Sequence, residues 1–475
     1  MNRRVTVVGG GLAGSEAAWQ LASRGFEVVL HEMRPLTTTP AHKTDKLAEL
    51  VCSNTFKSTE LTNAHGLLKA EMRLLGSMIL DAADSARVAA GTALAVDRDV
   101  FSATVTERIE SQSRISVVRD EVTEISAPCV VATGPLTSDK LAEAIRARLG
   151  VGALAFYDAI APIVPRESID DSIVFRGSRY GKETMDGADD GGAYLNCPMT
   201  RQQYDEFVDA LMSADQYHGH EFDEVPYFEG CMPVEVMAKR GRDTLRFGPL
   251  KPVGLRDPRT GREAYAVVQL RQEDRAGRMW NLVGFQTRLR IPEQQRVLRM
   301  IPGLAEAEFL RYGSIHRNSY LNSPAALSAH LAIRDEPTIL FAGQITGVEG
   351  YTESSATGLL AGINLTRLLS GEMPAVPPPT TMIGALYRHM NEADPRHFQP
   401  MNANFGLLDE LSEKVRDKKH KREMFAARAL RVMNDWIEAN GICERGAVEV
   451  TRAGRGAVED LSNKFADSVS LPGPT

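Results

Sequence analysis

Two cysteines stand in sequence contexts that suit a reactive thiol. Cys231 follows a glycine and precedes Met-Pro, which predicts an exposed loop, and Lys239 and Arg240 come shortly after it. Cys52 precedes Ser-Asn-Thr, residue types that often begin helices, so a helix starting there would direct its dipole at the sulfur. Positive charge favours the thiolate, which is the nucleophilic form. Because most single cysteines are small buried hydrophobic residues, these contexts alone leave both interpretations open.

The other three cysteines give no such signal. Cys129 lies in an apolar run that predicts a buried strand, while Cys197 and Cys443 match no motif. Five cysteines in 475 residues do not form a typical disulfide framework, and they fit a reducing cytoplasm. No Cys/His spacing typical of zinc sites is present, so we expect no metal.

A glycine-rich segment near the N-terminus predicts a dinucleotide-binding turn. It follows an apolar strand expected over 4–8 and precedes a helix expected over 15–24 and a second strand over 26–31. That strand leads to Glu32, 18 positions past the last glycine, where a carboxylate can accept hydrogen bonds from a ribose diol. The residues expected to bind the cofactor in this turn are Gly9, Gly10, Gly11, Leu12, Ala13 and Gly14.

A second pattern late in the chain bears on whether the dinucleotide is FAD or NAD(P). The buried strand expected over 338–342 ends in Gly343-Gln344, and a helix of small residues is expected over 354–369, with Glu353 just before it. Many two-domain flavoproteins have Gly-Asp at the end of such a strand. Glutamine can still hydrogen-bond a ribityl hydroxyl, so the flavoprotein pattern is only partly met. Gly343, Gln344 and Glu353 are expected to bind the cofactor.

These elements predict an α/β fold, with a Rossmann-like FAD-binding domain of the glutathione-reductase type and an inserted α+β domain. We expect the FAD-binding domain in two segments, 1–157 and 311–475, the second with a helical C-terminal region and a flexible tail. Frequent Gly, Asp and Arg and short strands mark 158–310 as the inserted substrate-binding domain. Residues 46–95 are expected to be mainly helical. The first residues contain no long apolar core and no small-residue cleavage site, and no run approaches about 18 apolar residues, so we expect neither a signal peptide nor a membrane span.

Charge is distributed unevenly along the chain. The 55 Lys and Arg and 62 Asp and Glu give a net charge of −7, which argues against a bulk nucleic-acid binder. Residues 239–299 nevertheless carry a local net charge of +9, and residues 413–431 carry +5. Such runs are often solvated faces, but they also permit local contact with phosphates. The candidate phosphate-binding residues are Arg240, Arg242, Arg246, Arg288 and Arg290.

Six segments together resemble one family, the folate- and FAD-dependent tRNA uracil-5 methyltransferases (TrmFO). The matching segments are GGGLAGSEAA, ELVCSNTFKS, FEGCMPVE, HRNSYLNSP, AGQITGVEGYTESSATGLLAG and HFQPMNANFGLL, spread from residue 9 to about 408. A broader relative, which installs carboxymethylaminomethyl groups on wobble uridine, shares a late Gly-Gln-Ile motif. It normally has a Cys-Asn-Pro type motif and a long helical C-terminal region, and this chain lacks both.

The resemblance implies methylation of a T-loop uridine of tRNA. Methylenetetrahydrofolate would supply the carbon, and FAD reduced by NAD(P)H would supply the electrons. By resemblance Cys231 is the nucleophile toward uracil and Cys52 its partner beside the flavin, although the two roles can be exchanged. The same chemistry on ribosomal RNA is an alternative, as is a flavin-dependent oxidoreductase of a small molecule. The latter would leave the two motif-bound cysteines and the basic stretch unexplained.

Overall fold

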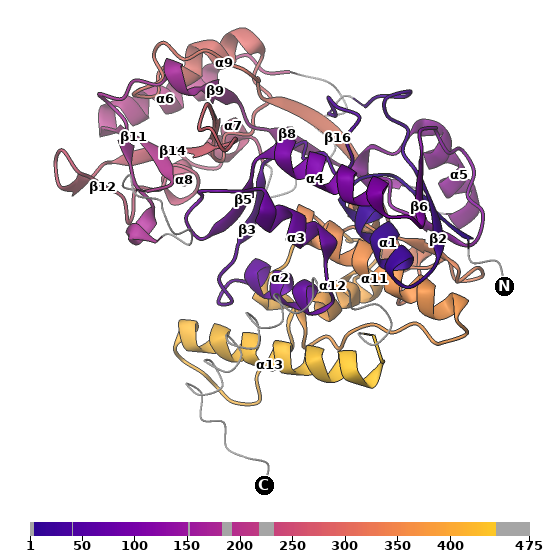
Figure 1. Cartoon of the computed structure of the whole chain (residues 1–475). Coiled ribbons are helices and arrows are strands. Elements are labelled where there is room, and N and C mark those ends of the chain that lie inside the picture. The colour runs from indigo at the N-terminus through magenta and orange to yellow at the C-terminus, as the bar shows by residue number, and fades with distance from the viewer. Residues whose placement is uncertain (1–3, 40, 151–152, 183–191, 218–231, 443–475) are drawn as a thin grey trace.

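The computed structural model describes residues 4–39, 41–150, 153–182, 192–217 and 232–442. Its two large hydrophobic cores are each built on a separate five-stranded sheet (Figure 1). The first core contains the N-terminal strands and the late helices, and the second is formed by residues between Val164 and Ala307. The glycine-rich turn and the basic stretch therefore lie in different parts of the molecule.

The first sheet is parallel throughout. In spatial order its strands are β17 (Ile339–Phe341), β7 (Cys129–Val131), β1 (Arg4–Val8), β2 (Glu27–His31) and β6 (Ile115–Val118). Helix α1 (Leu12–Ser23) connects β1 to β2. The strands read as continuous apolar runs because helices cover both faces of a parallel sheet. The strands predicted at both ends of the chain are thus confirmed, and β17 joins the N-terminal sheet.

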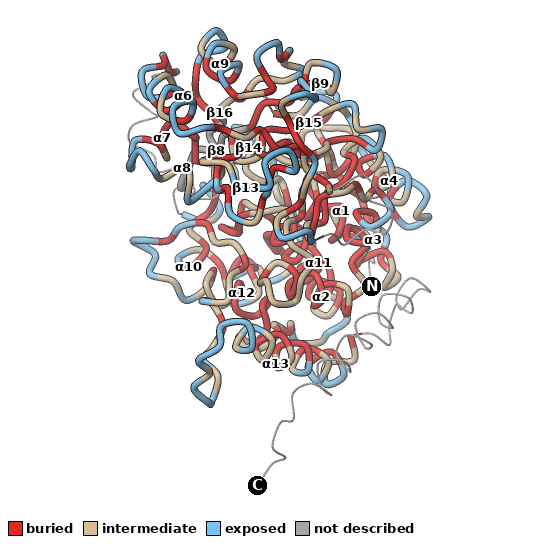
Figure 2. Tube along the Cα trace, turned by 90° about the vertical axis from the view of Figure 1, so that its left-hand side faces the viewer, coloured by how far each residue is buried: buried red, intermediate tan, exposed pale blue. Residues whose placement is uncertain are grey.

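Helix α11 (Tyr351–Leu369) packs directly on α1, and both lie among the most buried segments (Figure 2). Two glycines permit this contact. A Cβ atom added to Gly358 would lie 2.1 Å from the carbonyl oxygen of Ala13, and one added to Gly362 would lie 2.8 Å from that of Ala17. The approach of the two backbones brings the late motif to the glycine-rich turn.

The expectation that residues 46–95 are mainly helical is only partly correct. Helices α2 (Ala64–Leu74) and α3 (Met78–Ser85) are present, but β3 (Thr55–Ser58), β4 (Arg87–Val88) and β5 (Ala93–Val96) form a small antiparallel sheet. These strands are two to four residues long and pair with segments up to about 40 residues away, so local periodicity could not reveal them. The residues after Cys52 therefore enter a strand, and the predicted helix dipole at its sulfur is wrong.

Two buried glutamates tie helices of the first core together. Glu16 in α1 accepts hydrogen bonds from the N–H groups of Met78 and Ile79, at the start of α3. Glu71 in α2 likewise accepts from the first N–H groups of α12 (Met382–Glu392). Burial raises the pKa of both carboxyl groups, to about 8 for Glu71. The unpaired N–H groups of helix N-termini are natural partners for such carboxylates.

The second sheet is antiparallel. Its strands in spatial order are β10 (Phe175–Arg176), β11 (Tyr194–Met199), β14 (Ala266–Gln272), β15 (Met279–Leu282) and β9 (Ile163–Pro165). Helices α6 (Arg201–Ser213), α7 (Val234–Lys239) and α9 (Ile291–Leu298) contribute residues to the same core. Short elements α8 (Thr244–Phe247), β12 (Arg256–Asp257) and β13 (Arg262–Glu263) lie between α7 and β14.

Two paired strands carry the chain between the cores. Strand β8 (Ala153–Ile160) leads toward the second sheet, and β16 (Ser314–Leu321) returns antiparallel beside it. Around the first core lie α4 (Arg98–Ser111), α5 (Asp139–Leu149) and α10 (Ser323–Ala326), and α13 (Lys418–Ala439) lies at the end of the molecule away from α9 (Figure 1). No helix among the described residues is long and apolar enough to cross a bilayer. The expected flexible tail lies outside the described residues.

Candidate active site

The glycine-rich turn after β1 has the geometry of a phosphate cradle. Gly9 has φ +101°, and a Cβ atom there would lie 2.6 Å from the carbonyl oxygen of Ala132. A Cβ atom on Gly14 would lie 1.8 Å from the carbonyl oxygen of Gly9, so no side chain fits. Gly11 differs, because a Cβ atom there would meet no described atom within 4 Å. The backbone at Gly11 is thus open to a ligand at the N-terminus of α1, where a pyrophosphate binds well.

Glu32, at the end of β2, is positioned to bind a ribose. Its Oε2 accepts the N–H of Gly10 at 2.9 Å, and its Oε1 accepts the Nε of Arg34 at 2.8 Å. Burial acts to raise the pKa of Glu32, but the hydrogen bond and charge of Arg34 and the N–H of Gly10 outweigh it and lower the pKa. The carboxylate therefore stays charged. Its Oε1 also accepts the N–H of Arg34 at 3.0 Å, so the lone pair left for a sugar hydroxyl is on Oε2.

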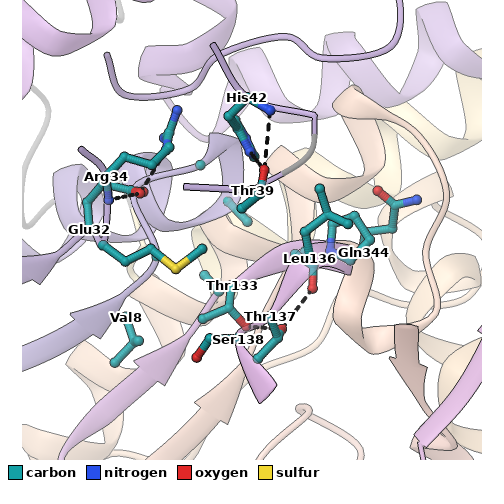
Figure 3. A pocket seen from close by; sticks show the side chains of 18 of the residues that line it. Val8, Glu32, Arg34, Thr39, His42, Thr133, Leu136, Thr137, Ser138 and Gln344 are labelled. Atoms are coloured by element: carbon teal, nitrogen blue, oxygen red, sulfur yellow. Dashed lines mark hydrogen bonds and ion pairs between the residues drawn. The ribbon is translucent and has the colours of Figure 1, made fainter. Parts of the chain in front are cut away.

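A long pocket extends from Glu32 past the cradle to the late motif. Figure 3 shows Glu32 on one side and Gln344 on the other, with Thr133, Thr137 and Ser138 between them. Its space, including the solvent at its mouth, is about 1030 Å³. Because residues of the glycine-rich turn, Glu32 and the late motif all line it, its length suits an extended ligand such as a dinucleotide. Of the cofactor-binding residues predicted from the sequence, the pocket wall contains Gly9, Gly11, Leu12, Ala13, Glu32, Gly343 and Gln344.

The far end of the pocket is formed where β17 turns into α11. Gly343 has φ +82° and donates its N–H to the Thr357 hydroxyl at 2.7 Å. The amide of Gln344 donates to Glu349, which fixes the direction of its side chain. Tyr351, the first residue of α11, lines the pocket beside Gln344. A flavin ring system reaching this end would therefore meet an amide, an aromatic ring and the start of a helix.

Cys52 lies next to this end of the pocket. Its N–H donates to the Tyr351 hydroxyl oxygen at 2.8 Å, and the N–H of Ser53 donates to the same oxygen at 3.1 Å. Val51, the residue before it, lines the pocket, and Cys52 itself is partly exposed. The main chain of a candidate catalytic cysteine is therefore fixed by a tyrosine that also forms the pocket wall.

Comparisons with known proteins place this geometry in a family. Residues 4–373 match the model described as glucose inhibited division protein A. A protein of Geobacter sulfurreducens named methylenetetrahydrofolate–tRNA-(uracil-5-)-methyltransferase TrmFO is 57% identical over 439 residues, which are 92% of this chain and 99% of the relative. The TrmFO of Heliobacterium modesticaldum is 54% identical over 438 residues, 92% of this chain and 98% of the relative. The chain belongs to the TrmFO family.

A solved structure supports the fold of this TrmFO-family chain. GidA of Aquifex aeolicus is 15% identical, and the alignment covers 99% of this chain and 79% of GidA with a TM-score of 0.67. At that identity the likeness shows the fold alone. It agrees with the Rossmann-like α/β fold predicted from the sequence.

The remaining cysteines of the TrmFO-family chain divide into two groups. Cys129 in β7 and Cys197 in β11 are fully buried, and burial raises the pKa of each thiol to about 12. Neither can form a thiolate at neutral pH, so the interpretation of Cys129 as a core residue is confirmed. Cys231 and Cys443 lie outside the described residues. Immediately after Cys231, Met232, Pro233 and Val234 are buried at the start of α7.

Glu353 is not in the pocket wall. Its carboxylate lies 3.0 Å from Nδ1 of His65 and accepts the N–H of Ala403 at 2.9 Å, and only 1% of it is exposed. Burial acts to raise the pKa of Glu353, but His65, Lys57 and the N–H of Ala403 lower it to about 2. Ala403 belongs to the HFQPMNANFGLL segment. Through the N–H of Ala403 this segment is hydrogen-bonded to Glu353 in the first turn of α11.

The arginines predicted to contact phosphates are placed differently from one another. Arg240 is exposed at the end of α7, and 54% of the Arg290 side chain is exposed beside Asp215 and Tyr217. Arg246 stacks on the ring of Tyr265 at 3.6 Å. Arg242 is held by Asp205 and Asp209. All these arginines lie in the part of the chain that forms the second core.

Arg288 is a poor candidate for a phosphate contact. Only 8% of it is exposed, and its Nε donates to Gln216 at 2.9 Å while its N–H donates to Glu235. Because Arg288 is buried and bonded to both Glu235 of α7 and Gln216, it connects α7 to the segment that follows α6. The sequence could not separate it from Arg290, because both lie in the same run of basic residues.

Three charged residues around Cys52 were not foreseen. Arg98 and Arg311 donate to its carbonyl oxygen, and Glu273 pairs with Arg98; the three come from distant segments of the sequence. None lies in a motif, and nothing in their local sequence distinguishes them from other charged residues. Only the packing of the two cores against each other brings them together.

Proposed function

We propose that this chain is a methylenetetrahydrofolate–tRNA-(uracil-5-)-methyltransferase that methylates a T-loop uridine at carbon 5. The observation that carries the proposal is the extended pocket, which begins at a dinucleotide cradle and ends beside Cys52. Relatives more than 50% identical over nearly the whole chain bear the name of this enzyme. A pocket for a redox dinucleotide next to a motif-bound cysteine suits a reductive methylation.

The ligand that we assign to the pocket is FAD, which when bound supplies the reducing electrons taken from NAD(P)H. The open backbone at Gly11 would receive its pyrophosphate, and Glu32 its adenosine ribose. Gln344 and Tyr351 would lie at its flavin end. We infer the glutathione-reductase type of domain, with 1–157 and 311–475 as its two segments and 158–310 inserted between them, because β17 joins the N-terminal sheet while the second core comes from the intervening chain.

Cys231 is assigned as the nucleophile. Its sulfur forms a bond to carbon 6 of uracil, and the displaced electron pair moves to oxygen 4. Carbon 5 then attacks the methylene carbon that comes from folate, and the bond from that carbon to its carrier nitrogen breaks. A base takes the proton from carbon 5, a hydride from the reduced cofactor would turn the transferred methylene into a methyl group, and the sulfur–carbon 6 bond breaks. This order restores the aromatic base and regenerates the thiolate, so the cysteine is unchanged after each turnover.

Cys52 is assigned to the flavin side, where it exchanges protons or shields the transferred carbon. Its place beside Val51 and Tyr351, both in the pocket wall, supports this assignment. The target uridine has to leave its stacked position to reach either sulfur, because reaction at a base atom requires an extruded nucleotide.

The surface that we assign to tRNA is the exposed basic part of the second core, with Arg240 and Arg290 as its leading members. Arg246 supports this surface by stacking on Tyr265. We also propose a cytoplasmic location, which a reaction on tRNA with folate and NAD(P)H supports. Phosphate contacts of this kind position an RNA without reading its sequence.

The test is to incubate the purified protein with unmodified tRNA transcript, NAD(P)H and methylenetetrahydrofolate labelled in its methylene carbon. Label in 5-methyluridine after nuclease digestion is expected, and labelled S-adenosylmethionine should give none. Label that appears with a ribosomal RNA transcript and not with tRNA would replace the substrate. Absence of label from both RNAs, with bound flavin that NAD(P)H reduces, would favour a small-molecule oxidoreductase.

A further inference from the structure

Two arginines hold the main chain around Cys52. Arg98 donates to the carbonyl oxygen of Leu50 at 2.9 Å and to that of Cys52 at 3.4 Å. Arg311 donates to the carbonyl oxygen of Val51 at 3.4 Å and to that of Cys52 at 3.2 Å. Three successive carbonyl groups thus face two guanidinium groups, which fixes the direction of the peptide that carries the thiol.

The carboxylate that pairs with Arg98 comes from the second core. Glu273, two per cent exposed and directly after β14, accepts the Nε of Arg98 at 2.7 Å. Nearby, Arg271 donates to the side-chain oxygen of Asn54 at 2.8 Å. The loop of Cys52 is therefore hydrogen-bonded to the first core through Arg98 and to the second core through Arg271, near the C-terminal end of β14.

The charges around Cys52 do not cancel. Arg98 and Arg311 each bring a guanidinium group to the carbonyl oxygen of Cys52, and Glu273 pairs with Arg98. Burial, with the repulsion of Arg98, lowers the pKa of Arg311 to about 10, so Arg311 remains protonated at neutral pH. Burial raises the pKa of the neighbouring Tyr351, which stays neutral.

Two further carboxylates close to this cluster have other partners. Asp97 accepts the N–H of Arg275 at 2.9 Å, and Asp274 pairs with Arg278 at 3.1 Å. Arg98, Arg311 and Glu273 by themselves thus carry a net charge of +1 around the main chain of Cys52, and Arg271, bonded to Asn54, adds another cation to this loop.

Stability alone does not explain this cluster. Within the described part of the chain, neither Oε1 of Glu273 nor Nε of Arg311 has a hydrogen-bond partner, although both atoms are buried. Buried polar atoms are nearly always paired in proteins, and unpaired ones often mark functional sites. Buried ion pairs in general contribute little net stability. Their place beside a motif-bound cysteine indicates that the charges serve the thiol.

We propose that Arg98 and Arg311 are positioning residues for Cys52, which fix its main chain and stabilise negative charge on its sulfur, with Glu273 setting the strength of this effect. The proposal rests on the function assigned to Cys52 above. Since Glu273 comes from the second core, correct docking of the two cores is a condition for an aligned, reactive thiol.

The experiment measures alkylation of Cys52 by iodoacetamide in the FAD-bound protein across a range of pH, with the modified peptide quantified by mass spectrometry. The variants are Arg311→Met, Arg311→Lys and Glu273→Gln. The control is Arg396→Met, because Arg396 is 82% exposed and paired with Asp394.

In Arg311→Met, the pH of half-maximal alkylation should rise by about one unit, because a cation is lost near the thiolate. In Glu273→Gln it should fall by a similar amount, because an anion is lost. Arg311→Lys should lie near the unchanged protein, and Arg396→Met should match it. A loosened structure would expose the thiol and shift both main variants in the same direction.

Shifts of the same sign in both variants, or an unchanged profile in variants that retain FAD, would overturn the proposal. If Arg311→Met loses FAD, Glu273→Gln still tests the proposal. Its pH of half-maximal alkylation is predicted to fall because an anion is lost, and this direction is opposite to the shift expected from a disrupted structure. Alkylation needs neither RNA nor folate. A failure of the methyl-transfer assay would therefore refute the proposed function without affecting this result.

Discussion

At the scale of single residues, Glu32 shows how a buried carboxylate can remain both charged and available. Oε1 accepts from the N–H and the Nε of Arg34, and Oε2 accepts from the N–H of Gly10; these bonds and the charge of Arg34 outweigh burial and keep the carboxylate charged. Glu32 lines the pocket, and Oε2 keeps a lone pair for a ligand. Hydrogen bonds to a charged acceptor contribute about 1.5–3 kcal/mol each, so loss of this charge should lower the affinity for the cofactor.

Glu32→Gln should therefore weaken FAD binding by about tenfold or more, since an amide keeps the shape but loses the charge and one acceptor oxygen. Flavin fluorescence during titration of the apoprotein measures this. Glu27→Gln is the matched control, because Glu27 begins the same strand with 57% of its side chain exposed. Equal affinity in Glu32→Gln and Glu27→Gln would show that Glu32 does not bind the ribose.

Glu353 provides a stability prediction with a definite pH window. Its folded pKa, about 2, lies below the ordinary value of 4.5, so its contribution is complete above pH 4.5 and is lost as the pH falls toward 2. The shift corresponds to about 3 kcal/mol. Glu353→Gln should lower the free energy of unfolding by about that amount at pH 7, and the deficit should shrink by more than 1 kcal/mol at pH 3.5. A deficit independent of pH would refute the lowered pKa of Glu353.

The sequence could indicate residues such as Glu32 because a short motif and its spacing determine their role. It could not indicate Arg98 or Arg311, whose roles depend on contacts between segments far apart in the chain. For Cys52 the motif was informative, but the expected helix dipole was wrong because a strand follows. Two arginines supply the positive charge instead.

At the scale of elements, the approach of α11 to α1 brings the late motif to the glycine-rich turn. The first parallel strands and both helices were predictable, because their apolar runs and small residues follow local rules. The short strands β3, β4 and β5 were not, because their partners lie in distant segments. Glycines serve two different purposes in this arrangement, and substitution distinguishes them.

Gly358→Val and Gly11→Ala should give opposite results. The first adds atoms where a Cβ would already lie 2.1 Å from the Ala13 carbonyl oxygen, so it should destabilise the protein by several kcal/mol, in the range of about 1–3 or more for overpacked cores. The second meets open space and should leave the stability of the apoprotein almost unchanged while weakening FAD binding. Thermal unfolding and flavin titration of both variants provide the check. An apoprotein destabilised by Gly11→Ala would contradict the open cradle.

At the scale of the whole molecule, we propose that the first core binds the cofactor and the second contacts the RNA. The pocket belongs to the first core, and the exposed arginines belong to the second. The loop of Cys52 lies between them, held from both sides. The basic stretch in the sequence suggested that one part of the chain contacts phosphates. The sequence could not indicate how the two cores pack against each other.

Arg290→Ala should weaken tRNA binding and reduce the slope of log K against log salt by about 0.9, the value for one phosphate contact. Arg396→Ala, equally a surface arginine, should change neither. Arg288→Ala should instead lower stability, because Arg288 is buried against Gln216. Filter binding at several salt concentrations measures the slopes. An unchanged slope in Arg290→Ala would remove this surface from the RNA interface.

The central claim is that thiol chemistry beside the FAD pocket methylates uridine with a folate carbon. The most direct measurement counts folate-derived label in 5-methyluridine made by the unchanged protein and by Cys52→Ala, Cys231→Ala and Cys197→Ala. Cys197 is buried in the second core and serves as the control. We predict label with the unchanged protein and with Cys197→Ala, and none with the other two variants. Full incorporation by either Cys52→Ala or Cys231→Ala would contradict the account.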